Sequence, residues 1–78
     1  MVAFWQERIT VNPEVCHGKA CIRGSRVMVS VILDELADGQ AAESIARDYG
    51  IEQEDVLAAI DYAAELARER VVPLPAQN

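Results

Sequence analysis

The spacing of apolar residues changes once along this chain, at about residue 29, and this change constrains the fold more than any other feature. Before it, short β-branched runs alternate with turn-forming residues, which predicts strands joined by tight turns. After it, apolar residues recur every three or four positions, which places them on one face of a helix. The sequence therefore predicts a mainly α fold with a small β hairpin near its N-terminus.

The predicted β element covers residues 9–29. Residues 9–11 form a β-branched run that is closed by an Asn-Pro pair. Two further short apolar runs, 21–22 and 27–29, flank Gly24, which can adopt the positive φ that a tight hairpin turn requires. We therefore expect a hairpin that reverses direction around this glycine.

Three helices are expected, at about residues 30–38, 41–49 and 52–70, followed by an extended tail at 71–78. The tail sequence Val-Val-Pro-Leu-Pro cannot continue a helix, because Pro lacks an N–H and restricts the residue before it. The second and third helices are joined by a short Gly-containing turn, so residues 1–70 should form one domain with a three-helix homeodomain-like or winged helix-turn-helix arrangement. The side chains predicted to point inward are Val29, Ile32, Leu33, Leu36, Ala37, Ala42, Ile45, Ala46, Tyr49, Val56, Ala59, Ile60, Ala63, Ala64 and Ala67.

The length of 78 residues is enough for one small domain. A domain of this size buries only about 60% of its unfolded surface, so we expect a homodimer or a higher oligomer to add stability. Apolar residues make up 51% of the chain, which favours a folded domain over a disordered one. There is neither a signal peptide nor an apolar run of roughly 20 residues, so we expect a cytoplasmic protein with no membrane partner.

Charge is distributed unevenly along the chain. The net charge of −6 disfavours broad, non-specific binding to nucleic acid. Residues 16–33 nevertheless carry three bases and no acid, whereas residues 34–70 carry eleven acids and three bases. The pattern predicts a basic end joined to an acidic helical body.

Both cysteines and the single histidine lie close together, as Cys16, His17 and Cys21. Structural zinc needs four ligands, and no second cluster supplies the fourth. The Cys-x4-Cys spacing is not the Cys-x-x-Cys spacing of oxidoreductases, and no helix start follows to lower a thiol pKa. We interpret the pair as structural thiols, and we expect no metal and no cofactor. One histidine without a nucleophile and an orienting group makes no catalytic set, so we expect a protein that is not an enzyme.

The basic residues support two hypotheses. In winged helix-turn-helix proteins a hairpin rests against the DNA backbone, so Arg23 and Arg26 are candidate phosphate contacts. Alternatively, these side chains tie the hairpin to the acidic helices. Recognition helices contact bases with their N-terminal residues, yet residues 52–55 include three acids, so a protein contact fits the third helix better than a base contact. The candidate contacts to nucleic acid or to a partner are Lys19, Arg23, Arg26 and Arg47.

Several motifs of this chain are shared with a known family. They are Ile9-Thr10 with Asn12-Pro13, Cys16-His17-Gly18-Lys19, Ile22-Arg23-Gly24-Ser25-Arg26-Val27, Val31-Ile32-Leu33, Leu36-Ala37 with Gly39, Ile45 with Asp48-Tyr49, Glu54-Asp55-Val56, and Ala58-Ala59 with Tyr62-Ala63. Through them the chain resembles, over about residues 9–70, the bacterial and archaeal family called domain of unknown function 433. Its members are widely predicted to be antitoxins of type II toxin–antitoxin pairs.

The resemblance implies a β hairpin packed on a helical bundle with a homeodomain-like helix-turn-helix, in which Gly18 and Gly24 shape the turns. It implies a toxin partner, commonly a PIN-like nuclease, and repression of the protein's own operon. The chain departs from the family pattern at Ala20, where Pro is frequent, and at two helix starts. Ala41 replaces a capping Ser or Thr, at a cost of about 1 kcal/mol. Glu52 replaces a Thr and makes the start of the third helix more acidic.

These observations lead to one main hypothesis: the protein is an antitoxin that neutralises a toxin and binds its own operator DNA through the helix-turn-helix. Arg68 and Arg70 lead into the tail, so they are the candidate contacts to the toxin, where an arginine could meet metal-binding carboxylates. Tails of this kind can also add a strand to a partner or lie in its groove. The alternatives are a DNA-binding regulator without a toxin, and a dimeric interaction scaffold that uses Phe4, Trp5 and the tail as its partner surface.

Overall fold

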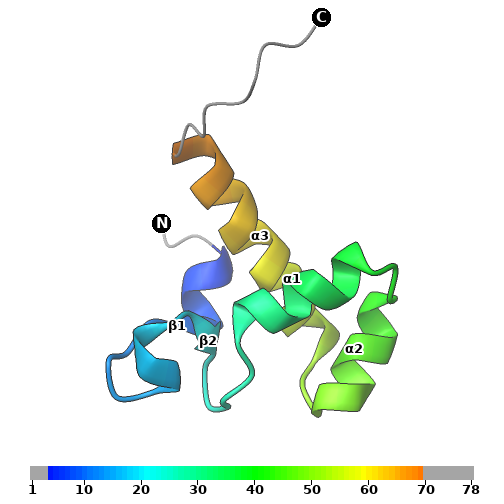
Figure 1. Cartoon of the computed structure of the whole chain (residues 1–78), viewed down its shortest axis with the longest axis horizontal. Coiled ribbons are helices and arrows are strands. Elements are labelled where there is room, and N and C mark those ends of the chain that lie inside the picture. The colour runs from blue at the N-terminus through cyan, green and yellow to red at the C-terminus, as the bar shows by residue number, and fades with distance from the viewer. Residues whose placement is uncertain (1–3, 70–78) are drawn as a thin grey trace, which may run out of the picture.

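The structure, a computed structural model, describes residues 4–69 (Figure 1). It confirms a mainly α fold with three helices and a small two-stranded antiparallel sheet near the N-terminus. The tail predicted at 71–78 lies outside the described residues, as does Arg70. No helix within the described part is long and apolar enough to cross a bilayer. The elements are the 3-10 helix η1 (Phe4–Glu7), β1 (Ile9–Thr10), the 3-10 helix η2 (Cys16–Gly18), β2 (Cys21–Ile22), α1 (Val29–Ala37), α2 (Ala42–Tyr49) and α3 (Gln53–Glu69).

The sheet forms between the first and second β-branched runs. Strand β1 pairs with β2 in antiparallel register, with Ile9 opposite Ile22. The third run, 27–29, was expected to be a strand, but it contributes only one bridge, from Met28 to Cys21. The reason is that α1 begins at Val29, one residue after this bridge. The turn between β2 and the bridge is closed by the N–H of Ile22, which donates to the carbonyl of Val27 at 2.9 Å.

Helices α2 and α3 are joined by the short turn 50–52. Gly50 ends α2 in the left-handed conformation, with φ 67°, and its N–H donates to the carbonyl of Ala46. A residue with a Cβ is strained at this φ, whereas Gly adopts it freely. At the other end of α2, Ala41 occupies the N-cap and provides no side-chain hydrogen bond. Helix α2 therefore has a well-formed C-terminus and a weak N-terminus.

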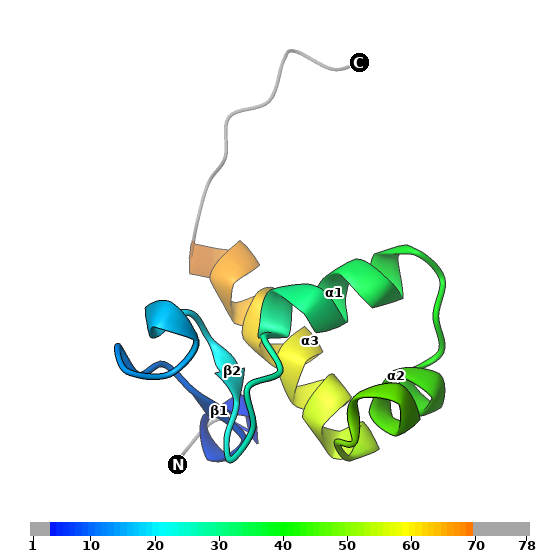
Figure 2. The same ribbon diagram turned by 60° about the horizontal axis from the view of Figure 1, so that its bottom comes forward.

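Helix α3 is the centre of the domain, because α1, α2, η1 and β1 all pack against it (Figures 1 and 2). The expected inward side chains Ile32, Ile45 and Val56 are fully buried. Four expectations were wrong, and two of them concern large side chains: Tyr49 is 38% exposed and Ile60 is 43% exposed. The buried residues of the core are Ile9, Cys21, Ile22, Val29, Ile32, Ile45, Ala46, Val56, Ala58 and Ala59, whereas Ala37 and Ala67, also expected inside, are exposed.

The wrong expectations on α3 have one physical cause. This helix carries apolar residues on more than one face, so periodicity alone does not show which face its neighbours cover. The neighbours cover the face that contains Val56 and Ala59, and they also bury Ala58. Leu57 and Ile60 are left on the uncovered side, with Leu57 52% exposed.

Candidate functional site

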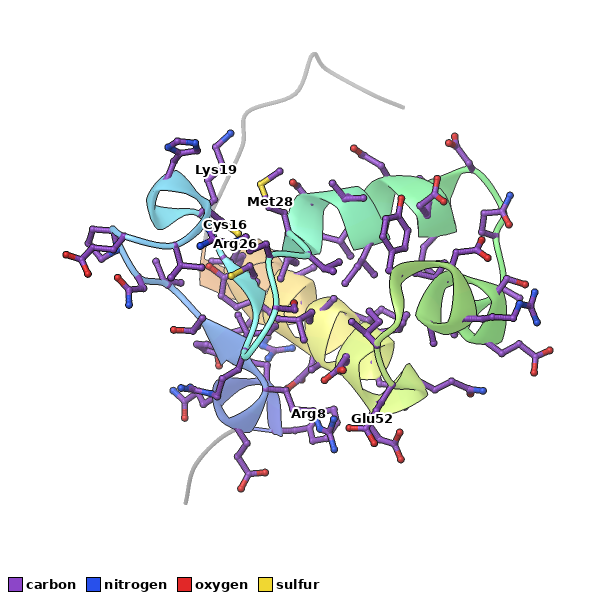
Figure 3. The ribbon with its side chains drawn as sticks, turned by 90° about the horizontal axis from the view of Figure 1, so that it is seen from below. Arg8, Cys16, Lys19, Arg26, Met28 and Glu52 are labelled. Atoms are coloured by element: carbon purple, nitrogen blue, oxygen red, sulfur yellow. The ribbon has the colours of Figure 1, made fainter. Side chains whose placement is uncertain are left out.

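The four basic candidates do not form one surface. Arg47 lies on α2, which Figures 1 and 2 show on the opposite side of the domain from the β element that carries the other three. Lys19 and Arg26 are both exposed on the β element (Figure 3). A DNA duplex that rested on the β element would therefore meet two or three of these charges at most.

Arg23 has a structural role within the N-terminal region. Its guanidinium donates to the backbone carbonyls of Gln6 at 3.2 Å and Ile9 at 3.4 Å. The backbone N–H of Arg23 also donates to the carbonyl of Arg8 at 2.7 Å. The side chain thus holds η1 and β1 to the hairpin turn, rather than tying the hairpin to the acidic helices as one hypothesis expected.

The ion pair to an acidic helix is made instead by Arg8. Its Nη1 lies 3.0 Å from Oδ1 of Asp55 and 3.2 Å from Oε1 of Glu52, at the start of α3 (Figure 3). The hydrogen bond to Asp55, and then that to Glu52, raise the pKa of Arg8 above its ordinary value. Sequence reasoning missed this contact, because 44 and 47 residues separate its partners and no local pattern signals it.

Among residues 4–69, Asp55 is the charged residue that is buried in the core, with 8% of its surface exposed. Its Oδ2 accepts a hydrogen bond at 3.0 Å from the backbone N–H of Glu52, the residue just before α3. An acid that reaches back from the first turn to the N-cap N–H is one half of a capping box, and this pattern could have been recognised in the sequence. Asp55 therefore serves the fold, whereas Glu54 remains exposed beside it.

The cysteine region has an unusual backbone. Cys16 and His17 have φ values of 53° and 55°, and Gly18 follows at 80°, so three successive residues are left-handed. This conformation costs roughly 1–2 kcal/mol for each residue with a side chain. The internal hydrogen bond from the N–H of Lys19 to the carbonyl of Cys16, at 3.0 Å, helps to hold it.

The two thiols are hydrogen-bonded to neighbouring carbonyls of the hairpin turn. Sγ of Cys16 donates to Arg26 at 3.5 Å, and Sγ of Cys21 donates to Ser25 at 3.7 Å. Burial, followed by a hydrogen bond with Cys16, raises the pKa of the Cys21 thiol, which makes it a poor nucleophile. Within residues 4–69, no three His, Cys, Asp or Glu side chains gather where they could hold a metal ion.

Trp5, which the scaffold hypothesis placed on the partner surface, packs against α3. Its backbone N–H donates to Oδ2 of Asp61 at 3.2 Å, and its indole Nε1–H donates to Oε2 of Glu65 at 3.1 Å. Its ring meets that of Tyr62 edge to face, with centroids 4.8 Å apart. Trp5 thus fastens η1 to α3, while Phe4 beside it is 41% exposed.

Helix α3 consequently divides into surfaces with different uses. Its start is acidic, its middle presents Leu57 and Ile60 to solvent, and its last turn carries the exposed Arg68. This acidic start occupies the position from which a helix-turn-helix protein reads bases. The surface is better suited to a protein partner than to a phosphate backbone.

Comparison with known proteins gives two matches. Residues 9–63 match the family described as "Protein of unknown function (DUF433)". The chain is also similar to the crystal structure of a DUF433 member protein from Anabaena variabilis ATCC 29413, at 29% sequence identity and a TM-score of 0.72. That similarity covers 82% of this chain but 64% of the other, so the chain spans less than two thirds of that protein. No curated protein matches the sequence significantly.

Proposed function

Since this chain belongs to the DUF433 family, we propose that it is a non-enzymatic antitoxin-like protein that binds and neutralises a toxin. A PIN-like nuclease is the expected partner. The proposal extends what the family resemblance implies. Among the described residues, it is supported by surfaces that suit protein contact.

The observation that carries the proposal is the charge of α3. Glu52 and Glu54 are exposed where a recognition helix would enter the major groove, and Arg8 offsets only part of that charge. Carboxylates at this position repel phosphates over the short distances at which salt does not screen them. The dispersed positions of Lys19, Arg26 and Arg47 do not compensate for that repulsion. Protein binding is therefore the function that this surface supports best.

The toxin contact is assigned to the C-terminal end of the chain. Arg68 is exposed in the last turn of α3, and Arg70 follows it in the sequence. The planar guanidinium group pairs with carboxylates through two parallel hydrogen bonds, so it is suited to occupy the acidic metal site of a nuclease. One of these two arginines would insert there while the following residues lie along the toxin.

A rescue experiment tests this assignment. The product of the gene adjacent to this one is expressed alone, with the full chain, and with a chain truncated after Ala67. We expect growth arrest alone, rescue by the full chain and no rescue by the truncated chain. A control variant, Arg47→Ala, should rescue as well as the full chain, because Arg47 lies on α2. A harmless neighbouring product, or equal rescue by the truncated chain, would contradict the proposal.

Auxiliary binding to operator DNA is a second candidate, and the geometry of α2 and α3 favours it. The two helices meet at the left-handed Gly50, in the manner of a helix-turn-helix. Fluorescence anisotropy with DNA from upstream of the gene, at two salt concentrations, tests this role. If Lys19 and Arg26 contact phosphates, replacing both by Ala should reduce the salt slope by about two. Absence of salt-sensitive binding, with and without the toxin, excludes the role.

A further inference from the structure

The uncovered side of α3 carries a seam of regularly spaced residues. Gln53, Leu57, Ile60, Ala64 and Ala67 follow one another at alternating intervals of four and three. This is the spacing of the core positions of a coiled coil, where each helix buries the seam against a second helix. Ala64 is half-buried, whereas the other four are exposed. In one copy of the chain the seam therefore has no covering helix among residues 4–69.

We propose that this seam joins two copies of the chain, with the two α3 helices antiparallel across a two-fold axis. A two-fold interface brings the same patch of both subunits together, so the patch must be self-complementary. Antiparallel alignment about residue 62 places Leu57 opposite the partner's Ala67. The same alignment places Ile60 opposite the partner's Ala64. Each large side chain then faces a small one, which allows the helices to approach closely.

The charges beside the seam support the antiparallel orientation. Glu54 immediately follows one seam position and Arg68 immediately follows another, so both flank the seam on the same side. In the antiparallel alignment Glu54 lies about 3 Å along the helix axis from the level of the partner's Arg68, which these long side chains can span, and symmetry creates this pair twice. In a parallel dimer the residues that follow the seam positions lie on opposite sides of the two-fold axis, so Glu54 and Arg68 would not pair with each other. The acidic start and the basic end of α3 thus favour the antiparallel dimer.

The seam has two acidic neighbours, and both are engaged within their own subunit. Asp61 flanks it near the axis, but its Oδ2 accepts the backbone N–H of Trp5 at 3.2 Å, so this carboxylate is engaged within its own subunit. Glu65 is held by the Trp5 indole in the same way, at 3.1 Å. The dimer uses Arg68, so the toxin contact of the proposed function would pass to Arg70. It also covers the exposed face of α3, which excludes base reading by that helix while the dimer persists.

The interface is small, which is typical of weak and transient association. A helix of 17 residues is about 25 Å long, so one helix from each subunit buries an area at the low end for specific complexes. We therefore expect a weak equilibrium between monomer and dimer that depends on the protein concentration. Sedimentation velocity on the purified full chain, from about 1 to about 500 μM, should show a monomer that converts to a dimer.

Two variants with a common design test the location of the interface. Ile60→Glu brings two carboxylates near the axis and should weaken the dimer at least about 50-fold, because a charge would be buried without a partner. Val11→Glu changes an apolar residue that is 55% exposed on the β element, and it should leave the dissociation constant unchanged. Circular dichroism should show that both variants remain folded. A wild-type monomer at about 500 μM, or an Ile60→Glu protein that dimerises normally, overturns the proposal.

A charge swap tests the orientation. Glu54→Arg and Arg68→Glu should each weaken the dimer by about 5- to 20-fold, because each reverses two symmetry-related pairs. The double variant restores opposite charges and should recover most of the affinity. A double variant that dimerises no better than the single variants overturns the antiparallel alignment. These measurements use the chain alone, so their outcome is independent of whether a toxin exists.

Discussion

Replacing Asp55 by Ala should destabilise the domain by about 2 kcal/mol. The change removes the carboxylate that accepts the N–H of Glu52 at 3.0 Å, and the loss of a cap interaction of this kind costs about 1 kcal/mol. It also removes a negative charge from the first turn of α3, where the helix dipole makes an acid worth up to about 1 kcal/mol. Asp55→Asn keeps an acceptor oxygen but loses the charge, so it should cost about half as much.

The assay is urea unfolding, followed by circular dichroism and by the fluorescence of the single tryptophan, Trp5. Glu54→Ala is the matched control, because Glu54 lies in the same turn but is exposed; it should lose only the dipole contribution, up to about 1 kcal/mol. An Asp55→Ala protein as stable as this control would refute the reasoning. Arg8→Met should also destabilise the domain, and its effect should be smaller in the Asp55→Ala background, since the two side chains share one contact.

Four further outcomes are expected. Iodoacetamide should label Cys16 in the native protein and Cys21 only after unfolding, as mass spectrometry would detect; rapid native labelling of both thiols would contradict the burial of Cys21. Folding favours the protonated form of Cys21, because the pKa of this thiol is raised in the folded state. The free energy of unfolding should therefore fall as pH rises above the thiol's ordinary pKa of about 9.0. Between pH 8 and pH 10, urea titrations should show a smaller fall for Cys21→Ala than for the wild type. His17→Gly should raise the free energy of unfolding by about 0.5–1 kcal/mol, because it relieves a left-handed φ of 55°; a loss of stability would show that the imidazole makes contacts of its own. Trp5→Ala should lower that free energy by about 2 kcal/mol through lost packing on Tyr62, and an unchanged thermal midpoint by circular dichroism would show that η1 adds little.

The fold class and most of the core were predictable because they depend on local periodicity. Ile32 and Ile45 lie on helices that each have one apolar face, so only one orientation of each helix buries its apolar residues. On α3 the same reasoning failed for Ile60, because apolar residues surround much of that helix and only its neighbours decide which side is buried. The apolar residues of α3 that made Ile60 look like a core residue are the residues that form the proposed dimer seam.

The candidate site was less predictable, because its contacts join distant parts of the chain. Arg8 appeared in the sequence as one base near the N-terminus, and nothing local connects it to Asp55, 47 residues later. The basic cluster between residues 16 and 27 was prominent in the sequence. In the structure, however, the guanidinium of Arg23 donates hydrogen bonds to the carbonyls of Gln6 and Ile9. Composition identified the charged residues, but tertiary structure determined which of them serve the fold.

The division of α3 into separate surfaces makes stability and association independently testable. Asp55 and the residues around Trp5 secure the helix to its own domain, whereas Leu57 and Ile60 contribute little to that packing. Substitutions at the first set should shift the unfolding midpoint at every protein concentration. Substitutions at the second set should remove only the part of the stability that increases with concentration, since association stabilises the folded state by mass action. Helix α3, although its connection to α2 resembles that of a DNA recognition helix, would then act mainly as a protein–protein interface.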